Sequence, residues 1–337
     1  MISFTKEKKN QFQREADAFL ASLPAGLQRI QSEAVRKAVD GCPSDLQRVR
    51  QTRNNDVALP GHVIAEYVRP DMRLYRPAAE AGEQRPLLIY LHGGGWTFGS
   101  INSCARFCGA LAGHGLSVLA VNYRLAPEHP YPAALGDCQE AIELALAKAS
   151  LWGCSPDRIS VGGDSSGGNL AVVSCLKRNE EGSSSLCSLL LFYPVVKAWE
   201  DNSPSWRKYA EGYGLDAALM NAFNRAYIPE GKQCRFISPA LASNEELSGL
   251  PPTLFIAAER DILYDQGREF AGRLLSSGVA VRYVAIPLSV HLFVTVQGQE
   301  AAFEQAVRLS AAFLKRSQEE AICAARRHHV LKSSGDR

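Results

Sequence analysis

The sequence lacks any apolar run long enough to cross a membrane. Its longest apolar segments, such as Leu189 to Val196, have the length of a β-strand and fall far short of the roughly 18 residues of a spanning helix. An excess of one charge is also absent, because 37 basic residues face 35 acidic ones. With a net charge of +2 in 337 residues, no strong field draws the chain toward polyanions, so we expect neither a nucleic-acid nor a membrane partner.

The chain also lacks the features of a secreted, disulfide-bonded protein. Charged residues interrupt the first twenty positions, which excludes the apolar core of a signal peptide. The nine cysteines are an odd number spread from Cys42 to Cys323, as is typical of free thiols in a reducing compartment. Cys104 and Cys108 would share a helix face but have no second ligand pair, so we expect no zinc site, no other metal and no cofactor. The sequence thus predicts a cytoplasmic protein.

What is present is a hydrophobic content of 46%, enough for a large core, arranged as alternating strands and helices. Continuous apolar runs of four to seven residues, typical of strands buried on both faces, recur from residue 87 onward. Helical patterns separate most of them. This alternation predicts an α/β fold with a mostly parallel central sheet and helices on both faces. The predicted strands of this core are 87–91, 118–123, 159–162, 189–193, 253–258 and 281–286.

Three segments lie outside this alternation. Residues 1–55 show the apolar spacing of helices and predict an N-terminal cap segment. The aromatic-rich insertion 197–250 separates two core strands and has the length of a lid, so we expect the two segments to form one cap. The core would comprise 56–196, beginning with a β-hairpin, and 251–317. Over 318–337 no core-forming pattern remains, and a disordered tail is predicted.

The strongest chemical motif is Gly163-Asp164-Ser165-Ser166-Gly167, a G-x-S-x-G elbow between a predicted strand and a predicted helix. On such a sharp turn a serine is held above the sheet edge, at the positive end of the following helix. A dinucleotide fingerprint is excluded because Asp164 stands where its second glycine belongs, and a P-loop is excluded because Asn169 replaces its lysine. Ser165 is therefore the candidate nucleophile, and a tight turn without chemistry is the competing interpretation.

A second motif, His92-Gly93-Gly94-Gly95-Trp96, follows the predicted strand 87–91. Successive glycines can turn several N–H groups toward one point, as the oxyanion of an acyl-transfer intermediate requires. The N–H of Ser166, next to the nucleophile, would supply another donor. We interpret His92 as a residue that shapes this loop rather than as a base. A flexible glycine loop is the alternative.

A serine nucleophile needs a base and an acid. Among the seven histidines, His291 stands shortly after the last predicted strand, where the chain order serine, acid, histidine requires it. Asp261 is the first carboxylate clear of the preceding strand, whereas Glu259 lies within the strand end and Asp265 begins the next helix. Asp261 is therefore favoured as the acid over Glu259 and Asp265.

Taken together, these motifs resemble the hormone-sensitive lipase family of α/β-hydrolase esterases, and within it the bacterial acetyl esterases. The family's HGGG loop is His92 to Gly95, its elbow is Gly163 to Gly168, and its D-x-L-x-D block is Asp261 to Asp265. Its Y-R-L-A-P-E block is Tyr123 to Glu128, and the resemblance covers about residues 85–315. The site residues that it implies are the triad Ser165, Asp261 and His291, the oxyanion-hole residues Gly93, Gly94, Gly95 and Ser166, with Gly93 shaping the loop, and the supporting residues His92 and Asp164.

The resemblance implies hydrolysis of a small-molecule ester through an acyl-enzyme. We expect short acyl chains, from acetyl to about hexanoyl, because neither cap segment is a long apolar surface. Deacetylation or amide hydrolysis of a sugar or drug-like substrate is an alternative that the same residues support. The family also includes plant hormone receptors, which are non-catalytic binding proteins. Such a protein is a weaker alternative here, because those receptors lose the catalytic histidine, whereas this chain has His291.

One departure from the family pattern concerns the loop before His291. The family usually has a glycine three residues before its histidine, whereas this chain has Leu288. If that position requires a positive φ, Leu288 is strained or the loop is rebuilt. The sequence leaves the oligomeric state open, with a homodimer as one option.

Overall fold

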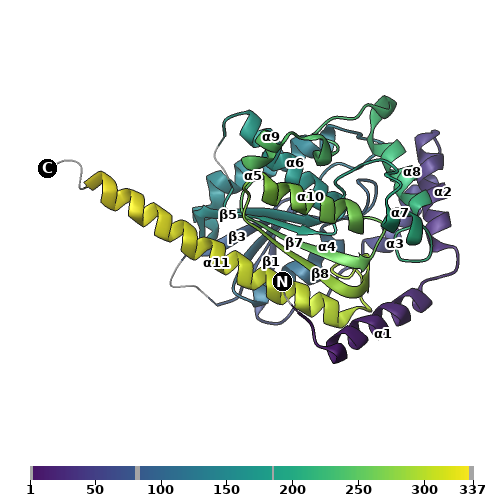
Figure 1. Ribbon diagram of the computed structural model, residues 1–337, viewed down its shortest axis with the longest axis horizontal. Helices are drawn as coiled ribbons and strands as arrows, with labels where there is room; N and C mark the ends of the chain where they lie inside the picture. Colours follow the sequence, from purple (N-terminus) through teal and green to yellow (C-terminus); the bar gives the residue numbers. More distant parts are fainter. Residues whose placement is uncertain (1–2, 80–83, 184–185, 334–337) are drawn as a thin grey trace.

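The computed structural model describes residues 3–79, 84–183 and 186–333, and these carry a central sheet of eight strands (Figure 1). The strand order across the sheet is 1-2-4-3-5-6-7-8, and strand 2 runs antiparallel to both of its neighbours while the other pairs are parallel. The mostly parallel α/β sheet is therefore confirmed. The strands are β1 (Val63–Arg69), β2 (Met72–Pro77), β3 (Arg85–Leu91), β4 (Ser117–Val121), β5 (Cys154–Asp164), β6 (Leu189–Phe192), β7 (Thr253–Arg260) and β8 (Val281–Val290).

The central strands are buried on both faces, as their continuous apolar runs predict. Every residue of β4 and β6 is buried. Alternate residues of one strand enter different clusters, so that Leu87 and Ile89 pack on one face of the sheet and Leu88 and Tyr90 on the other. Because the side chains on both faces of these strands are buried, a shift in register would disrupt their packing, so the register is strongly fixed.

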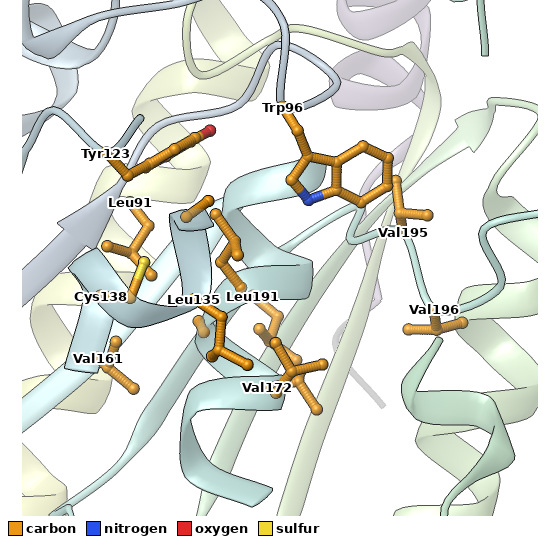
Figure 2. Close-up of a cluster of buried hydrophobic side chains, with 14 of the residues drawn as sticks. Leu91, Trp96, Tyr123, Leu135, Cys138, Val161, Val172, Leu191, Val195 and Val196 are labelled. Carbon is orange, nitrogen blue, oxygen red and sulfur yellow. The ribbon is translucent and has the colours of Figure 1, made fainter. Parts of the chain in front are cut away.

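Helices cover each face of the sheet. One face packs against α4 (Ile101–Gly113) and the first part of α11 (Glu300–Ser333). The other face packs against α5 (Ala133–Lys148), α6 (Ser166–Glu180) and α10 (Tyr264–Ser276). Figure 2 shows the core beneath this second face, where Leu135 and Cys138 of α5 approach Val161 and Leu191 of the strands.

The N-terminal segment and the first part of the insertion lie side by side at one end of the molecule (Figure 1). The N-terminal helices are α1 (Lys6–Ser22), α2 (Leu27–Val39) and α3 (Ser44–Arg53), and the insertion contributes α7 (Pro204–Lys208) and α8 (Ala217–Tyr227). Hydrogen bonds join α2 to the insertion: Gln28 Nε2 donates to the Gly214 carbonyl, the Asp216 N–H donates to Gln28 Oε1, and Ser32 Oγ donates to the Ala218 carbonyl.

The second part of the insertion packs on core helices instead of on α2. It contains a 3₁₀ turn at Pro239–Leu241 and the short helix α9 (Asn244–Ser248). Arg273 of α10 donates to the carbonyls of Ala240 and Ala242, at 2.6 Å each. The cap predicted from residues 1–55 and 197–250 stays a prediction.

The C-terminal segment differs from the sequence-based prediction. A disordered tail is predicted from residue 318, whereas α11 continues to Ser333 and projects beyond the sheet (Figure 1). The segment is rich in Ala, Glu, Arg and Lys, whose high helix propensity favours a helix there. In the part of the chain that the structure describes, no helix has both the length and the apolar content needed to cross a bilayer.

Candidate active site

The elbow lies between the end of β5 and the start of α6. Ser165 has φ 54° and ψ −118°, a combination that L-residues rarely adopt, and its side chain is held at the N-terminus of α6. Glycine is required on both sides of this turn, because a Cβ on Gly163 or Gly167 would collide with the Leu91 carbonyl oxygen of β3. The close approach of strand and helix therefore depends on the two motif glycines.

His291 and Asp261 form a buried pair at the ends of neighbouring strands. The Nδ1 of His291, directly after β8, lies 2.5 Å from Oδ2 of Asp261, directly after β7, and the side chains are 2% and 0% exposed. The other oxygen, Oδ1, accepts a hydrogen bond from the Leu263 N–H at 3.0 Å. Because Asp261 occupies Nδ1, Nε2 is the imidazole nitrogen left for other chemistry.

Ser165 is tied to the same end of the sheet through β6. Its N–H donates to the Phe192 carbonyl at 2.9 Å, and the ring of the next residue, Tyr193, lies 4.4 Å from the His291 ring. In the described structure the Ser165 hydroxyl makes no hydrogen bond, and catalytic hydrogen bonds commonly tighten only when substrate binds.

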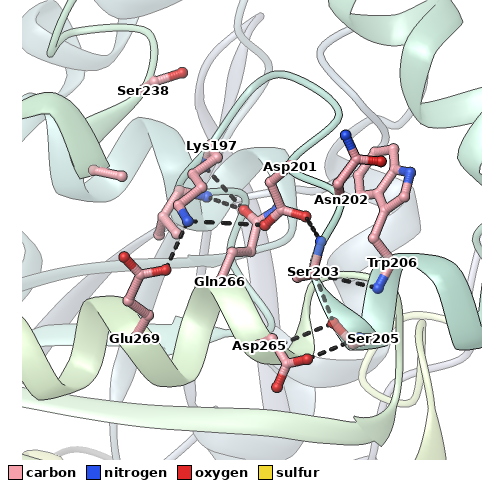
Figure 3. A network of polar contacts seen from close by, with 12 residues as sticks. Lys197, Asp201, Asn202, Ser203, Ser205, Trp206, Ser238, Asp265, Gln266 and Glu269 are labelled. Atoms are coloured by element: carbon pink, nitrogen blue, oxygen red, sulfur yellow. Dashed lines mark hydrogen bonds and ion pairs between the residues drawn. The ribbon is translucent and has the colours of Figure 1, made fainter.

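The two alternative acids have other partners. Glu259 accepts a hydrogen bond from the Leu288 N–H at 2.8 Å. Asp265 accepts the N–H of Ser205 at 2.8 Å and donates its own N–H to the Ser205 hydroxyl at 3.1 Å, which fixes α7 to α10 (Figure 3). Of the three carboxylates considered from the sequence, Asp261 is thus the one in contact with His291.

The motif His92 to Trp96, here called the glycine loop, passes over the elbow. Gly94 and Gly95 have φ values of 123° and 59°, which favour glycine, and a Cβ on Gly95 would collide with the Phe223 ring of α8. Their N–H groups have no hydrogen-bond partner among the described residues. The Gly93 N–H differs because it donates to Oδ1 of Asp164 at 3.0 Å, so it is not a free donor.

Asp164 links the elbow to the glycine loop. Its Oδ1 also accepts the Tyr90 hydroxyl at 2.9 Å. Burial raises the pKa of Asp164 to about 6, although the hydrogen bonds from Tyr90 and Gly93 and the nearby His291 each act to lower it. Tyr90 carries no motif, so the sequence analysis did not identify it as part of the site.

His92 shapes the glycine loop as a neutral imidazole. Burial lowers the pKa of His92 to about 4. Its Nδ1 lies 2.9 Å from the Gly93 carbonyl, and its ring is stacked on Tyr123 at 4.3 Å. The Tyr123 hydroxyl donates to the His92 carbonyl at 2.6 Å, so this tyrosine of the Y-R-L-A-P-E block supports the loop from below.

The insertion and the N-terminal helices also contact the glycine loop. Trp96, with φ 57°, is stacked on Tyr227 of α8 at 4.4 Å and 3° between the ring planes. Figure 2 shows Trp96 above the core cluster, with its indole turned toward Val195. Arg50 of α3 donates to the carbonyls of Thr97 and Ala126, both at 2.8 Å. Sequence analysis missed Arg50, because nothing near it in the sequence marks it.

Leu288, which stands where the family usually has glycine, adopts a strained conformation, one of the two options expected from the sequence. Its φ is 57°, and the strand β8 continues past it to Val290 instead of ending at the predicted residue 286. Its N–H donates to Glu259 and its carbonyl accepts from Nε of Arg260 at 2.8 Å. These partners, Glu259 and Arg260, are the two residues before Asp261.

A cavity of about 590 Å³ adjoins the elbow and the glycine loop. Gly93, Gly94 and Asp164 line one part of it, and residues of α1, α2 and α3 line another. No group of three His, Cys, Asp or Glu side chains suited to a metal ion occurs among the residues described.

Known proteins resemble the chain over the same residues. A family model described as the alpha/beta hydrolase fold matches residues 88–295. Carboxylesterase NlhH of Mycobacterium tuberculosis is 34% identical over 291 residues, 83% of this chain and 91% of that protein. Ethyl acetate hydrolase of Pseudomonas putida is 36% identical over 230 residues, 66% of this chain and 70% of that protein.

Solved structures agree with these relatives. The crystal structure of a thermostable esterase from Pseudomonas putida ECU1011 has a TM-score of 0.73 and 27% identity, over 91% of this chain and 96% of that one. The family match spans the elbow, the glycine loop and the pair formed by Asp261 and His291. The chain belongs to the α/β-hydrolase fold family, in the hormone-sensitive lipase-like branch of carboxylic ester hydrolases.

Proposed function

We propose that the protein is a serine carboxylesterase that hydrolyses short-chain esters of small molecules through an acyl-enzyme. The observation that carries the proposal is the 2.5 Å contact between His291 Nδ1 and Asp261 Oδ2, at the sheet edge that also bears the Ser165 elbow. This contact orients the imidazole so that its second nitrogen can serve a serine nucleophile.

In the proposed reaction, Nε2 of His291 takes the proton of Ser165 as the serine oxygen attacks the ester carbon. Asp261 stabilises the resulting imidazolium. The N–H groups of Gly94, Gly95 and Ser166 hold the oxyanion, and each such donor typically lowers the barrier by about 3–4 kcal/mol. His291 then protonates the leaving alcohol, and a water molecule repeats the steps to release the acid. The proposed steps use no cofactor or metal.

The size of the cavity supports a small substrate. A volume of about 590 Å³ lies within the range of small-molecule sites. The ethyl acetate hydrolase to which the chain is similar acts, by its name, on a two-carbon acyl group. We therefore keep acetyl to about hexanoyl as the proposed acyl range, and a cytoplasmic location and a homodimer stay predictions from the sequence.

The test compares Ser165→Ala with wild type on 4-nitrophenyl acetate and on longer acyl homologues. We expect the variant to lose at least about a thousandfold in kcat, since its nucleophile is gone. Ser248→Ala, a substitution of an exposed serine in α9, is the matched control and should keep full activity. Wild type should act fastest on acyl chains of two to six carbons.

Three results would contradict the proposal. Equal kcat in wild type and Ser165→Ala would exclude Ser165 as the nucleophile. A rate maximum at acyl chains of ten carbons or more would exclude a preference for short acyl chains. Faster hydrolysis of 4-nitroacetanilide than of 4-nitrophenyl acetate would favour amide hydrolysis instead.

A further inference from the structure

The cavity beside the glycine loop is lined by one cation that has no ionic partner in the described part of the chain. Three of its lining residues carry a charge: Arg53, Arg106 and Asp164. The Asp164 carboxylate accepts from Tyr90 and Gly93. Arg106 pairs with Glu300, and its guanidinium lies over the Phe303 ring. Arg53, by contrast, has neither an ion pair nor a side-chain hydrogen bond among the described residues.

Arg53 is held at the cavity wall by apolar packing. It is the last residue of α3, and its guanidinium lies 5.2 Å from the Phe98 ring, which is itself buried against Phe223. Burial lowers the pKa of Arg53 below its ordinary value, as expected for a cation that has lost part of its hydration. An arginine remains charged at neutral pH, so an anion in the cavity would offset the hydration that this half-buried guanidinium has lost.

Another arginine of the same helix, Arg50, has a carboxylate partner. Arg50 meets both oxygens of Glu128 at 2.8 Å. A guanidinium is shaped for such a two-point contact with a carboxylate. Arg53 has the same donor set but lines the cavity, and no described carboxylate pairs with it.

Other polar groups on the cavity wall also lack partners. Gln31 is 3% exposed, and its Oε1 has no hydrogen-bond partner. Asn102 Oδ1 and Arg106 Nη1 are likewise buried without partners. All three residues line the cavity together with Arg53. Buried polar atoms are normally paired, and these unpaired ones make the wall beside Arg53 polar.

We propose that this cavity binds esters that carry a carboxylate, and that Arg53 holds the carboxylate. The inference rests on the proposed function, because Gly93 and Gly94 line the same cavity and would place the ester group. A carboxylate fits better than a phosphate, since Arg53 is the one guanidinium of the described lining without an ion pair, and the Asp164 carboxylate on the same wall disfavours a second negative charge. Hydrolysis adds water to such an ester, giving the second carboxylic acid and the alcohol.

The test measures how well the enzyme distinguishes charged from neutral esters of similar length. One pair, monomethyl glutarate and methyl valerate, carries the charge in the acyl part. The other, acetoxyacetate and propyl acetate, carries it in the alcohol part. Acid release in a pH-stat gives kcat/KM for each ester. We expect wild type to prefer the charged ester in at least one pair by about tenfold or more, mainly through KM.

Arg53→Met should lower this preference by about tenfold or more, and Arg53→Lys should retain part of it. The matched control is Arg48→Met, which removes the same charge from the same helix at a side chain that is 74% exposed and pairs with Asp45. Arg48→Met should keep the preference within about twofold, because an exposed charge is screened.

Failure of this inference is distinguishable from failure of the proposed function. A wild-type enzyme that hydrolyses the neutral esters and disfavours both charged ones would overturn the role of Arg53 and leave the esterase intact. An equal loss of preference in Arg48→Met would also overturn it, because a general field would then explain the effect. If wild type and Ser165→Ala were equally inactive on all four esters, the proposed function itself would fall. Weaker inhibition of neutral-ester hydrolysis by glutarate than by glutaramide would contradict the site without any variant.

Discussion

Asp164 joins the elbow to the glycine loop through one carboxylate oxygen. That oxygen accepts both the Tyr90 hydroxyl and the Gly93 N–H, at 2.9 and 3.0 Å. Because the side chain is buried, its ionised form is disfavoured, and the pKa of Asp164 is raised to about 6. At neutral pH the group is charged, and its two hydrogen bonds are the stronger, charge-assisted kind.

This buried carboxyl predicts a pH-dependent stability of definite sign. Folded Asp164 keeps its proton up to about pH 6, whereas an unfolded aspartate releases it near 3.8. Between these values the folded state binds more protons, so stability falls as pH rises. The free energy of unfolding of wild type minus that of Asp164→Asn should therefore fall by about 2 kcal/mol from about pH 4.5 to about pH 7.5. Urea unfolding at the two pH values measures it.

The comparison with the variant is needed because His92 acts in the opposite direction. Burial lowers the pKa of His92 from 6.5 to about 4, so its unfolded form binds more protons in that range and stability rises with pH. Both proteins keep His92, so its contribution cancels in the difference. A difference that stays constant or grows with pH would show that Asp164 is not an isolated buried acid.

At the scale of elements, β7 and β8 position the acid and the histidine through more than their ladder of hydrogen bonds. The strand pairing shifts between Ala258 and Arg260, and beyond the shift Glu259 and Arg260 hold the two sides of Leu288. Arg260 also forms an ion pair with Asp17 of α1 at 2.7 Å. One irregular stretch of two strands therefore connects the candidate triad to the cap.

The strain at Leu288 can be measured by substitution. An alanine at φ 57° keeps the backbone penalty and loses the leucine contacts, whereas a glycine loses the contacts but removes the penalty. Leu288→Gly should therefore be more stable than Leu288→Ala by about 1 kcal/mol, although glycine also makes the unfolded chain more flexible. Urea unfolding midpoints at equal slopes give the comparison. If the alanine variant equalled the glycine variant, Leu288 would not be strained.

The strands of the core were predictable because burial on both faces leaves a continuous apolar run in the sequence. β3, β6 and β7 begin or end within two residues of the predicted ranges. The extension of β8 past residue 286 depends on Glu259 and Arg260, which no local pattern of β8 reveals.

For the molecule as a whole, the motifs predicted which residues gather at one edge of the sheet, but not what holds them there. Tyr90 precedes its partner Asp164 by 74 residues, and Arg50 precedes its partner Thr97 by 47 residues. Such long-range contacts leave no trace in a single sequence, because one tyrosine in a strand or one arginine in a helix has many possible partners. The cap and the core are joined at the glycine loop by contacts of this type.

Substitution of Arg50 tests the contact between α3 and the glycine loop. It binds two loop carbonyls and both oxygens of Glu128, and its side chain is 22% exposed. We expect Arg50→Met to lower the free energy of unfolding by about 2 kcal/mol, since partners that were satisfied lose their donors. Because Thr97 adjoins the glycine loop, kcat on 4-nitrophenyl acetate should fall by about tenfold, more than KM rises. Arg48→Met, on the same helix, should change neither quantity appreciably, and Arg50→Lys should recover part of both. A folded Arg50→Met enzyme with undiminished kcat would mean that Tyr123 and Trp96 hold the glycine loop in place without the N-terminal helices.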